Sequence, residues 1–278
     1  MPVVVDAVVM GELPDRRPVT VRRLLGGVVH DPDASHGDQD KPYRAGELCG
    51  DGPGRFMWRL GWCRQVGSPE SAWPDEPPWH GLKEGVRIGA RRDVVVRELG
   101  RREATFGDLS REPARREATM LFQTPTVFRR SARPRSRFQV RRMWPLPDPV
   151  MVFDSVARAW NSSAPAGLML DEQLTADVLD HVELVDFDGI ARPIGQGAPA
   201  TVSRIGIAAE GNRMRRAWEA SGFVGRVRFG VARGAPELVV RVFTALLLFA
   251  PFCGVGALRT YGFGSVEVED ADPAGVAR

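Results

Sequence analysis

Apolar residues recur along the chain with two spacings, one typical of β-strands and one typical of helices. The opening stretch VVVDAVV is apolar almost without interruption and predicts a buried strand at residues 3–9. In DPVMVFDSVARAW the apolar residues fall three or four positions apart, which predicts a helix with one buried face at 148–160. The segment ELVVRVFTALLLFAPF is apolar on nearly all sides and predicts a buried helix at 237–252.

Applied to the whole chain, these patterns give two series of elements in similar order. Besides one short helix at 19–29, the first half is predicted to contain strands at 3–9, 43–48, 55–63 and 86–99. The second half is predicted to contain the two helices above and strands at 118–128, 181–186, 202–208, 222–231 and 265–269. We therefore predict an α+β fold of two tandem ferredoxin-like (RRM-like) domains, each with the order βαββαβ.

The division between the two series places an N-terminal domain at residues 1–115, a C-terminal domain at 116–270 and a disordered tail at 271–278. The N-terminus has no basic segment ahead of its apolar stretch, so it does not resemble a signal peptide. The longest uncharged apolar run, 242–258, is interrupted by Pro251 and two glycines and is too short for a bilayer span. These features predict a cytoplasmic protein that does not associate with membranes.

The chain has three cysteines, Cys49, Cys63 and Cys253. Their odd number and the absence of C-x-x-C spacing argue against a disulfide framework and against a zinc site. We therefore expect each cysteine to be a small, buried, apolar side chain.

Positive charge is concentrated in the middle of the chain, although the net charge of the protein is only +3. The segment from Arg87 to Arg142 contains 16 Arg but only 6 Asp or Glu. Guanidinium groups bind phosphate through paired hydrogen bonds, so a nucleic-acid surface is one interpretation of this segment. The other is a general compositional preference, since all but two of the 38 basic residues in the chain are Arg.

Four glycines lie close together in GVGALRTYGFG, which follows the last predicted helix. The stretch is not a dinucleotide-binding fingerprint, because Arg259 replaces the third glycine and the helix precedes the loop instead of following it. It is not a P-loop either, because no Gly-Lys-Ser/Thr follows. Two interpretations remain open: an anion-binding concavity of backbone amides to which Arg259 adds charge, or a tight turn that packs the helix on the sheet.

Three segments resemble a known family. GVGALRTYGFGSVEV resembles the C-terminal glycine-rich motif of the RAMP superfamily of CRISPR-associated proteins. TPTVFRR with the following PLPDPVMVFDSVARAWN, and GFVGRVRFGV, resemble the endoribonucleases of that superfamily that process precursor CRISPR RNA. The resemblance spans residues 122–268 and is weak at 165–220. It implies a metal-independent endonuclease without cofactors that cleaves CRISPR repeats by 2′-OH attack, leaving 2′,3′-cyclic phosphate and 5′-OH ends and generating guide crRNA.

The resemblance also implies the catalytic residues. In SHGDQDKPY, His36 falls on the catalytic histidine of the family and Lys41 on a lysine that assists it. Ser35 stands where the family usually has Leu, and the preceding predicted helix has no tyrosine where some members place one, so His30 is an alternative base. Imidazole can accept and donate protons near neutral pH, and an ammonium group stabilises the charge of the transition state. The loop lacks the glycine and glutamate positions of a calcium-binding EF-hand.

RNA binding is assigned to the arginine cluster and the glycine-rich stretch. The predicted RNA-binding residues are Arg129, Arg130, Arg133, Arg135, Arg137, Arg141, Arg142, Gly254, Gly256, Arg259, Gly262 and Gly264. The expected partner is CRISPR repeat RNA; association with effector-complex subunits and a homodimer are left open. Two alternatives stay open as well: a non-catalytic RAMP subunit that holds guide RNA in an effector complex, and an unrelated Arg-rich nucleic-acid binder.

Overall fold

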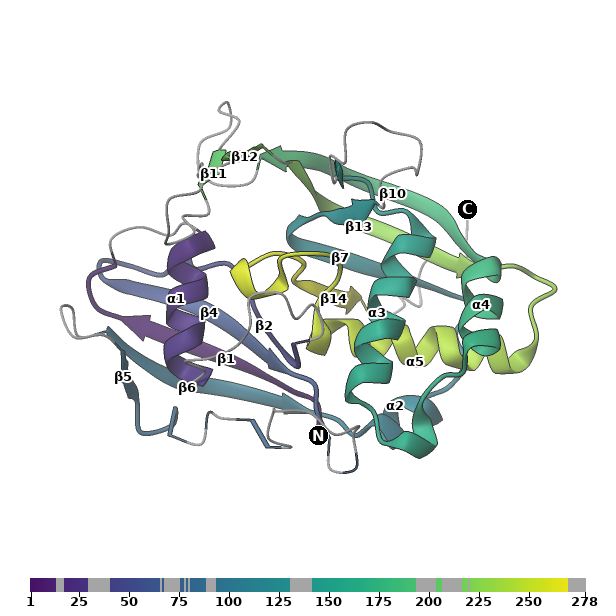
Figure 1. The fold of residues 1–278 in the computed structure, drawn as a ribbon, viewed down its shortest axis with the longest axis horizontal. Coiled ribbons are helices and arrows are strands. Elements are labelled where there is room, and N and C mark those ends of the chain that lie inside the picture. Colours follow the sequence, from purple (N-terminus) through teal and green to yellow (C-terminus); the bar gives the residue numbers. More distant parts are fainter. Residues whose placement is uncertain are drawn as a thin grey trace.

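The computed structural model describes residues 1–13, 18–29, 41–65, 67, 76–77, 79, 81–88, 94–130, 142–193, 204–206, 217–219 and 221–269 of the chain. In this part of the chain two α+β domains lie side by side, each built on its own sheet (Figure 1). The registered strand pairs of both sheets are antiparallel. The predicted fold of two tandem ferredoxin-like domains is therefore confirmed.

The N-terminal sheet has the strand order β2-β4-β1-β6-β5, with β3 paired to β4. Its strands are β1 (Val3–Met10), β2 (Tyr43–Ala45), β3 (Cys49–Gly50), β4 (Arg55–Trp62), β5 (Val86–Ile88) and β6 (Val94–Glu103). Helix α1 (Pro18–Val29) covers one face (Figure 1). The second helix of the predicted βαββαβ order is missing from the described residues between β4 and β6, where buried Trp79 and Leu82 complete the core instead.

The alternation of side chains along β1 gives this sheet two buried faces. Val3, Val5 and Val9 pack with α1 into the core of the N-terminal domain. Val4 points the opposite way and joins the core of the C-terminal domain. The back of the N-terminal sheet is thus part of the interface between the domains.

The C-terminal sheet has the strand order β10-β13-β7-β14, which is the order 2-3-1-4 of a ferredoxin-like domain. Its strands are β7 (Glu117–Thr126), β10 (Val182–Pro193), β13 (Ser221–Val231) and β14 (Val266–Glu269). The helices α3 (Pro149–Ser163), α4 (Glu172–His181) and α5 (Glu237–Cys253) lie together over the C-terminal sheet (Figure 1). The predicted helices at 148–160 and 237–252 are thus confirmed as α3 and α5.

Aromatic side chains hold these helices on the sheet. The ring of Phe153 on α3 lies 5.4 Å from that of Phe229 on β13 and 5.0 Å from that of Phe243 on α5. Helix α3 begins at Asp148, whose carboxylate accepts a hydrogen bond from the amide of Met151 at 3.2 Å. The apolar spacing of this helix was visible in the sequence.

The remaining elements are short. They are α2 (Phe106–Arg111), β8 (Phe128–Arg130), β9 (Arg142–Trp144), β11 (Arg204–Gly206), β12 (Ala217–Glu219) and the 3₁₀ turns η1 (Ala166–Leu168) and η2 (Arg259–Tyr261). β8 pairs with β9, and β11 with β12. β11 is the structural counterpart of the strand predicted at 202–208.

The cysteine prediction is correct for two residues and wrong for one. Cys63 and Cys253 are buried, but Cys49 is exposed. Cys49 lies on the two-residue strand β3 at the border of the sheet, where its thiol donates to the carbonyl oxygen of Glu47 at 3.9 Å. Among the described helices, none combines the length and the apolar character that a membrane crossing requires.

Candidate functional site

The predicted catalytic loop joins α1 to β2. His30 and His36 lie outside the described residues, whereas Lys41 is described. The Nζ atom of Lys41 lies 5.6 Å from the centroid of the Tyr43 ring, within reach of a cation–π interaction. Tyr43 in turn stacks on Trp62, with ring centroids 6.5 Å apart and planes inclined by 11°. The end of the loop that carries Lys41 is therefore attached to the N-terminal sheet.

The glycine-rich loop, residues 254–264, lies beside the two elements that flank this predicted catalytic loop. Its 3₁₀ turn η2 contacts α1, the element before the catalytic loop, and β2, the element after it. In Figure 1 the glycine-rich loop, coloured yellow, runs between α1 and the C-terminal sheet. The fold thus brings together two segments that are more than two hundred residues apart in the sequence.

Close backbone packing explains why this loop needs glycine. Gly256 and Gly264 have φ angles of 79° and 71°, which side chains rarely tolerate. A Cβ atom on Gly256 would lie 2.5 Å from the carbonyl oxygen of Val127, and one on Gly264 would collide with the carbonyl oxygen of Val255. A Cβ atom on Gly262 would lie 3.3 Å from the carbonyl oxygen of Gly46 in the N-terminal domain. The second interpretation of the glycines, tight packing, therefore has direct structural support.

Much of the loop backbone is also engaged within the protein. The amides of Gly254, Val255 and Ala257 donate to carbonyl oxygens at 2.8 Å, and that of Gly256 donates to Oγ of Ser155 at 2.9 Å. Nη1 of Arg259 donates to the carbonyl oxygen of Cys253 at 3.1 Å. The other interpretation of the glycines, an anion-binding concavity, requires contacts between this loop and an anion. Such contacts stay a prediction for the segment 258–263.

Three residues of the arginine cluster lie on the strand pair of β8 and β9, which we call the arginine hairpin and whose base adjoins the glycine-rich loop. Arg129 and Arg130 lie on β8 and Arg142 on β9, and these two strands pair with Arg130 opposite Arg142. The other predicted arginines, Arg133, Arg135, Arg137 and Arg141, lie outside the described residues. Just before β8, Val127 accepts a hydrogen bond from the amide of Ala257 at 2.8 Å. The arginine hairpin, the glycine-rich loop and the ends of the predicted catalytic loop thus meet in one region.

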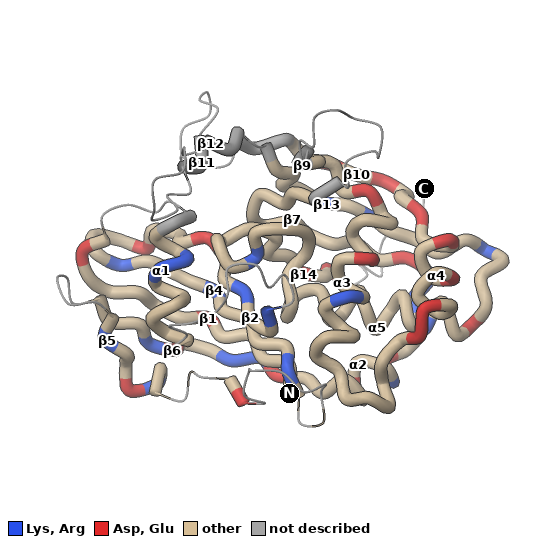
Figure 2. The backbone as a smooth tube through the Cα atoms, in the orientation of Figure 1, with Lys and Arg blue, Asp and Glu red and all other residues tan. Residues whose placement is uncertain are grey.

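Acidic residues gather at a different place. Figure 2 shows them concentrated around α4 and β10, at the end of the C-terminal domain remote from α1. They include Glu172, Asp177, Asp180, Glu183, Asp186 and Asp188. Carboxylates repel phosphate, so this end is unsuited to a nucleic acid.

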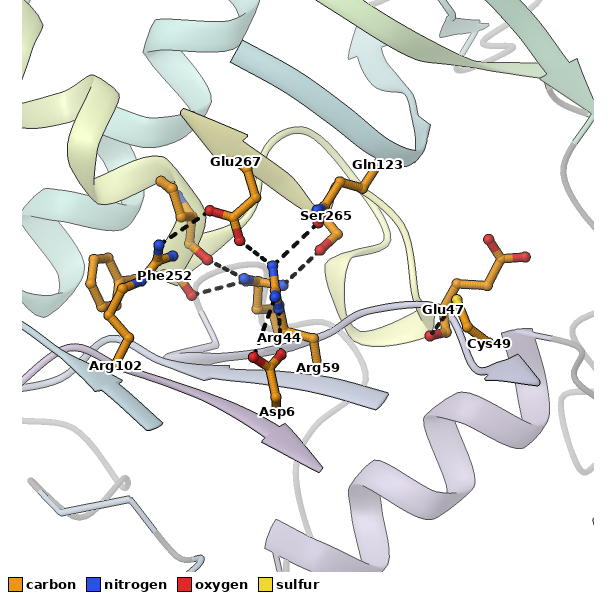
Figure 3. A network of polar contacts seen from close by, with 11 residues as sticks. Asp6, Arg44, Glu47, Cys49, Arg59, Arg102, Gln123, Phe252, Ser265 and Glu267 are labelled. Atoms are coloured by element: carbon orange, nitrogen blue, oxygen red, sulfur yellow. Dashed lines mark hydrogen bonds and ion pairs between the residues drawn. The ribbon is translucent and has the colours of Figure 1, made fainter. Parts of the chain in front are cut away.

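The interface between the domains contains two arginines that the sequence did not single out (Figure 3). Arg59 on β4 forms ion pairs with Asp6 at 2.6 Å and with Glu267 on β14. Burial would lower the pKa of Arg59, but its bond to Asp6 and the charge of Glu267 outweigh that effect and raise it. Arg44 on β2 is fully buried, and burial lowers its pKa to about 10, so it remains a cation at neutral pH.

Comparison with known proteins adds independent evidence. The family model of the CRISPR-associated endoribonuclease Cas6 matches residues 120–266, slightly more than half of the chain. This match covers most of the C-terminal sheet together with the glycine-rich loop. The comparison with curated proteins gave no match.

Several solved structures share the fold along nearly the whole chain. A Cas6 product complex is 22% identical with a TM-score of 0.66, and the alignment covers 96% of this chain and 100% of that one. A Cas6 substrate mimic complex is 21% identical with a TM-score of 0.62 and coverage of 96% and 99%. Cas6 from Thermus thermophilus is 19% identical with a TM-score of 0.60 and coverage of 97% and 98%. These likenesses establish the tandem ferredoxin-like fold.

Proposed function

The chain belongs to the family of CRISPR-associated Cas6 endoribonucleases, and from this premise we propose that it cuts CRISPR precursor RNA within its repeats to generate guide crRNA. The family match over residues 120–266 is the observation that carries the proposal. It includes the base of the arginine hairpin and the glycine-rich loop, and the latter contacts the elements that flank the predicted catalytic loop. The solved relatives described as product and substrate mimic complexes support an enzyme over a purely structural subunit.

The proposed reaction is an internal transesterification that needs no metal ion. The ribose 2′-OH loses its proton and attacks the adjacent phosphorus, forming the O2′–P bond as the P–O5′ bond breaks. The departing O5′ takes up a proton, and the products are a 2′,3′-cyclic phosphate and a 5′-OH end. One group must accept a proton and one must donate a proton, which imidazole can do near neutral pH.

We assign the proton transfers to His36, with His30 as the alternative, and charge stabilisation to Lys41. Negative charge builds up on the nonbridging oxygens during the attack, and an ammonium group stabilises it more in the transition state than in the ground state. The attachment of Lys41 near the aromatic pair of Tyr43 and Trp62 supports this role, because it gives the loop end a defined position. The elements that flank this loop contact the glycine-rich loop, which adjoins the arginine hairpin that we propose to bind the RNA backbone.

The RNA is proposed to bind through its phosphates and its stem-loop shape. Seven arginines of the hairpin segment provide guanidinium groups: Arg129, Arg130, Arg133, Arg135, Arg137, Arg141 and Arg142. The acidic end around α4 and β10 favours an RNA path on the opposite side, over the glycine-rich loop. Gly254, Gly256, Arg259, Gly262 and Gly264 shape that loop and place residues 258–263 within reach of the RNA.

The test is incubation of the purified protein with its cognate repeat RNA in EDTA. Cleavage is expected to persist, to stop with a single 2′-deoxy substitution at the cut site, and to fall about 100- to 10,000-fold in His36→Ala. RNA binding should survive this substitution. Normal cutting by His36→Ala together with loss of cutting by His30→Ala would move the base to His30. A stable complex with RNA that stays uncut under all conditions would instead identify a non-catalytic RAMP subunit.

A further inference from the structure

A buried arginine links the strand after the predicted catalytic loop to the other domain. Arg44 lies on β2, three residues after Lys41, and its side chain is 0% exposed. Its Nε donates to the carbonyl oxygen of Phe252 at 3.1 Å, its Nη1 to Oγ of Ser265 at 3.1 Å, and its Nη2 to the carbonyl oxygen of Pro251 (Figure 3). All three acceptors belong to the C-terminal domain and flank the glycine-rich loop.

The acceptors suit a cation at this place. Pro251 and Phe252 lie in the last turn of α5, where carbonyl groups have no partner within the helix and carry the negative end of the helix dipole. A buried charge is tolerated only when its hydrogen bonds are satisfied, so the guanidinium holds the helix end in one geometry. Arg44 therefore fixes where α5 stops and the glycine-rich loop begins.

Two glycines make room for this side chain. Gly61, which pairs with Arg44 across β2 and β4, lacks the Cβ atom that would collide with the carbonyl oxygen of Phe252. A Cβ atom on Gly254 would lie 2.9 Å from Cδ of Arg44. Residues from two distant parts of the sequence thus form one close-fitting joint, which we call the Arg44 joint: Arg44, Gly61, Gly254 and the acceptors at 251, 252 and 265.

We propose that Arg44 is a positioning residue for RNA cleavage. Through the Arg44 joint, β2 and the Lys41 end of the predicted catalytic loop keep a constant position relative to the glycine-rich loop and the base of the arginine hairpin. Cleavage requires the reacting groups to be aligned with the bound phosphodiester, so loosening the joint affects the chemical step more than RNA binding. This inference rests on the proposed function.

Another interdomain contact provides the matched control. Arg102 on β6 also reaches across the interface, to Glu267 at 3.2 Å and to the ring of Phe252, 5.3 Å from its centroid. Its side chain is 50% exposed and it lies on the strand farther from the predicted catalytic loop. Arg102→Gln removes an interdomain arginine but none of the hydrogen bonds of the Arg44 joint.

The experiment compares Arg44→Gln, Arg44→Lys and Arg102→Gln with the wild type in two measurements. The first is single-turnover cleavage of repeat RNA at saturating protein, together with the Kd for RNA carrying a 2′-deoxy group at the cut site. The second is hydrogen–deuterium exchange of segments 41–46 and 250–258. For Arg44→Gln we expect faster exchange in both segments and cleavage slowed about 100-fold, the order that a displacement of about 1 Å produces, with little change in Kd.

Arg44→Lys should recover part of the cleavage rate because it keeps the charge, and Arg102→Gln should match the wild type in both measurements. Two results for Arg44→Gln overturn the positioning role: unchanged hydrogen–deuterium exchange, or altered exchange with a wild-type cleavage rate. A loss of cleavage rate that is explained entirely by weaker RNA binding overturns it as well. If the wild type itself does not cut RNA, the proposed function fails and exchange alone decides whether Arg44 couples the two segments. Should Arg44→Gln not fold, Ser265→Ala, which removes one acceptor, is expected to give a smaller change in the same direction, and no change refutes the proposal.

Discussion

Replacing Gly264 by alanine tests whether the glycine-rich loop exists mainly for packing. Gly264 has a φ of 71°, accepts a hydrogen bond from the amide of Val255 at 2.8 Å and donates one to Pro125 at 3.2 Å. Forcing alanine into this left-handed conformation costs about 1–2 kcal/mol, and losing one backbone hydrogen bond adds about 1 kcal/mol. The new Cβ atom also collides with the backbone oxygen of Val255, which cannot rotate away, and such overpacking costs about 1–3 kcal/mol.

These contributions together predict a loss of about 3–6 kcal/mol in unfolding free energy. For a chain of this size that loss corresponds to a Tm lower by about 6 °C or more. Gly167→Ala is the control, because Gly167 lies in η1 with no heavy atom within 4 Å of the added Cβ, and we expect a change within about 0.5 kcal/mol. Thermal unfolding followed by circular dichroism measures both variants.

Equal Tm values for Gly264→Ala and Gly167→Ala would refute the packing argument. If, in addition, Gly264→Ala lost its affinity for 2′-deoxy repeat RNA, the anion-binding interpretation of the glycines would replace it.

Three further predictions concern the domain interface, a helix end and the thiols. Arg59→Gln removes the ion pairs to Asp6 and Glu267 and should lower the free energy of unfolding by about 1 kcal/mol at low salt. The difference in Tm from the wild type should become smaller at about 1 M NaCl, because dissolved ions screen such pairs. Asp148→Ala removes the cap of α3 and should cost about 1 kcal/mol by thermal unfolding, whereas Asp148→Asn should restore most of it. In the native protein only the exposed Cys49 should react readily with a thiol reagent at pH 8. Burial raises the pKa of the Cys253 thiol to about 11 and that of the Cys63 thiol further still, which keeps both unreactive. Two or three reactive thiols per folded chain would contradict this prediction.

Sequence patterns predicted the elements that carry a strong local signal. The apolar segments of β1 and α5 were recognised because their burial is nearly continuous along the chain. Helix α4 was missed because Val178 is its one residue buried in the core. Its clearest signal is the cap residue Asp171, whose carboxylate accepts a hydrogen bond from the amide of Leu174 at 2.7 Å. The weak amphipathicity of α4 explains why the sequence patterns did not predict this helix.

The site was predictable only as far as local motifs reached. The glycine-rich stretch and the arginine cluster were recognisable as motifs, and the fold places them together. Arg44 offered no such signal, because it is one arginine in a chain that holds 38 basic residues and its acceptors lie more than 200 positions away. The residues next to Gly61 in the sequence likewise do not predict its close packing, because the atom that leaves no room for a Cβ there is the carbonyl oxygen of Phe252.

The separation of 208 residues between Arg44 and Phe252 has a consequence for biosynthesis. Domains generally fold as they leave the ribosome, the N-terminal one first. While the ribosome is still translating α5, the N-terminal domain has already emerged. Its Arg44 then lacks its carbonyl acceptors, and the sheet face that carries Val4 is not yet covered by the C-terminal domain. A nascent chain is therefore expected to acquire the proposed cutting centre only when translation is nearly complete.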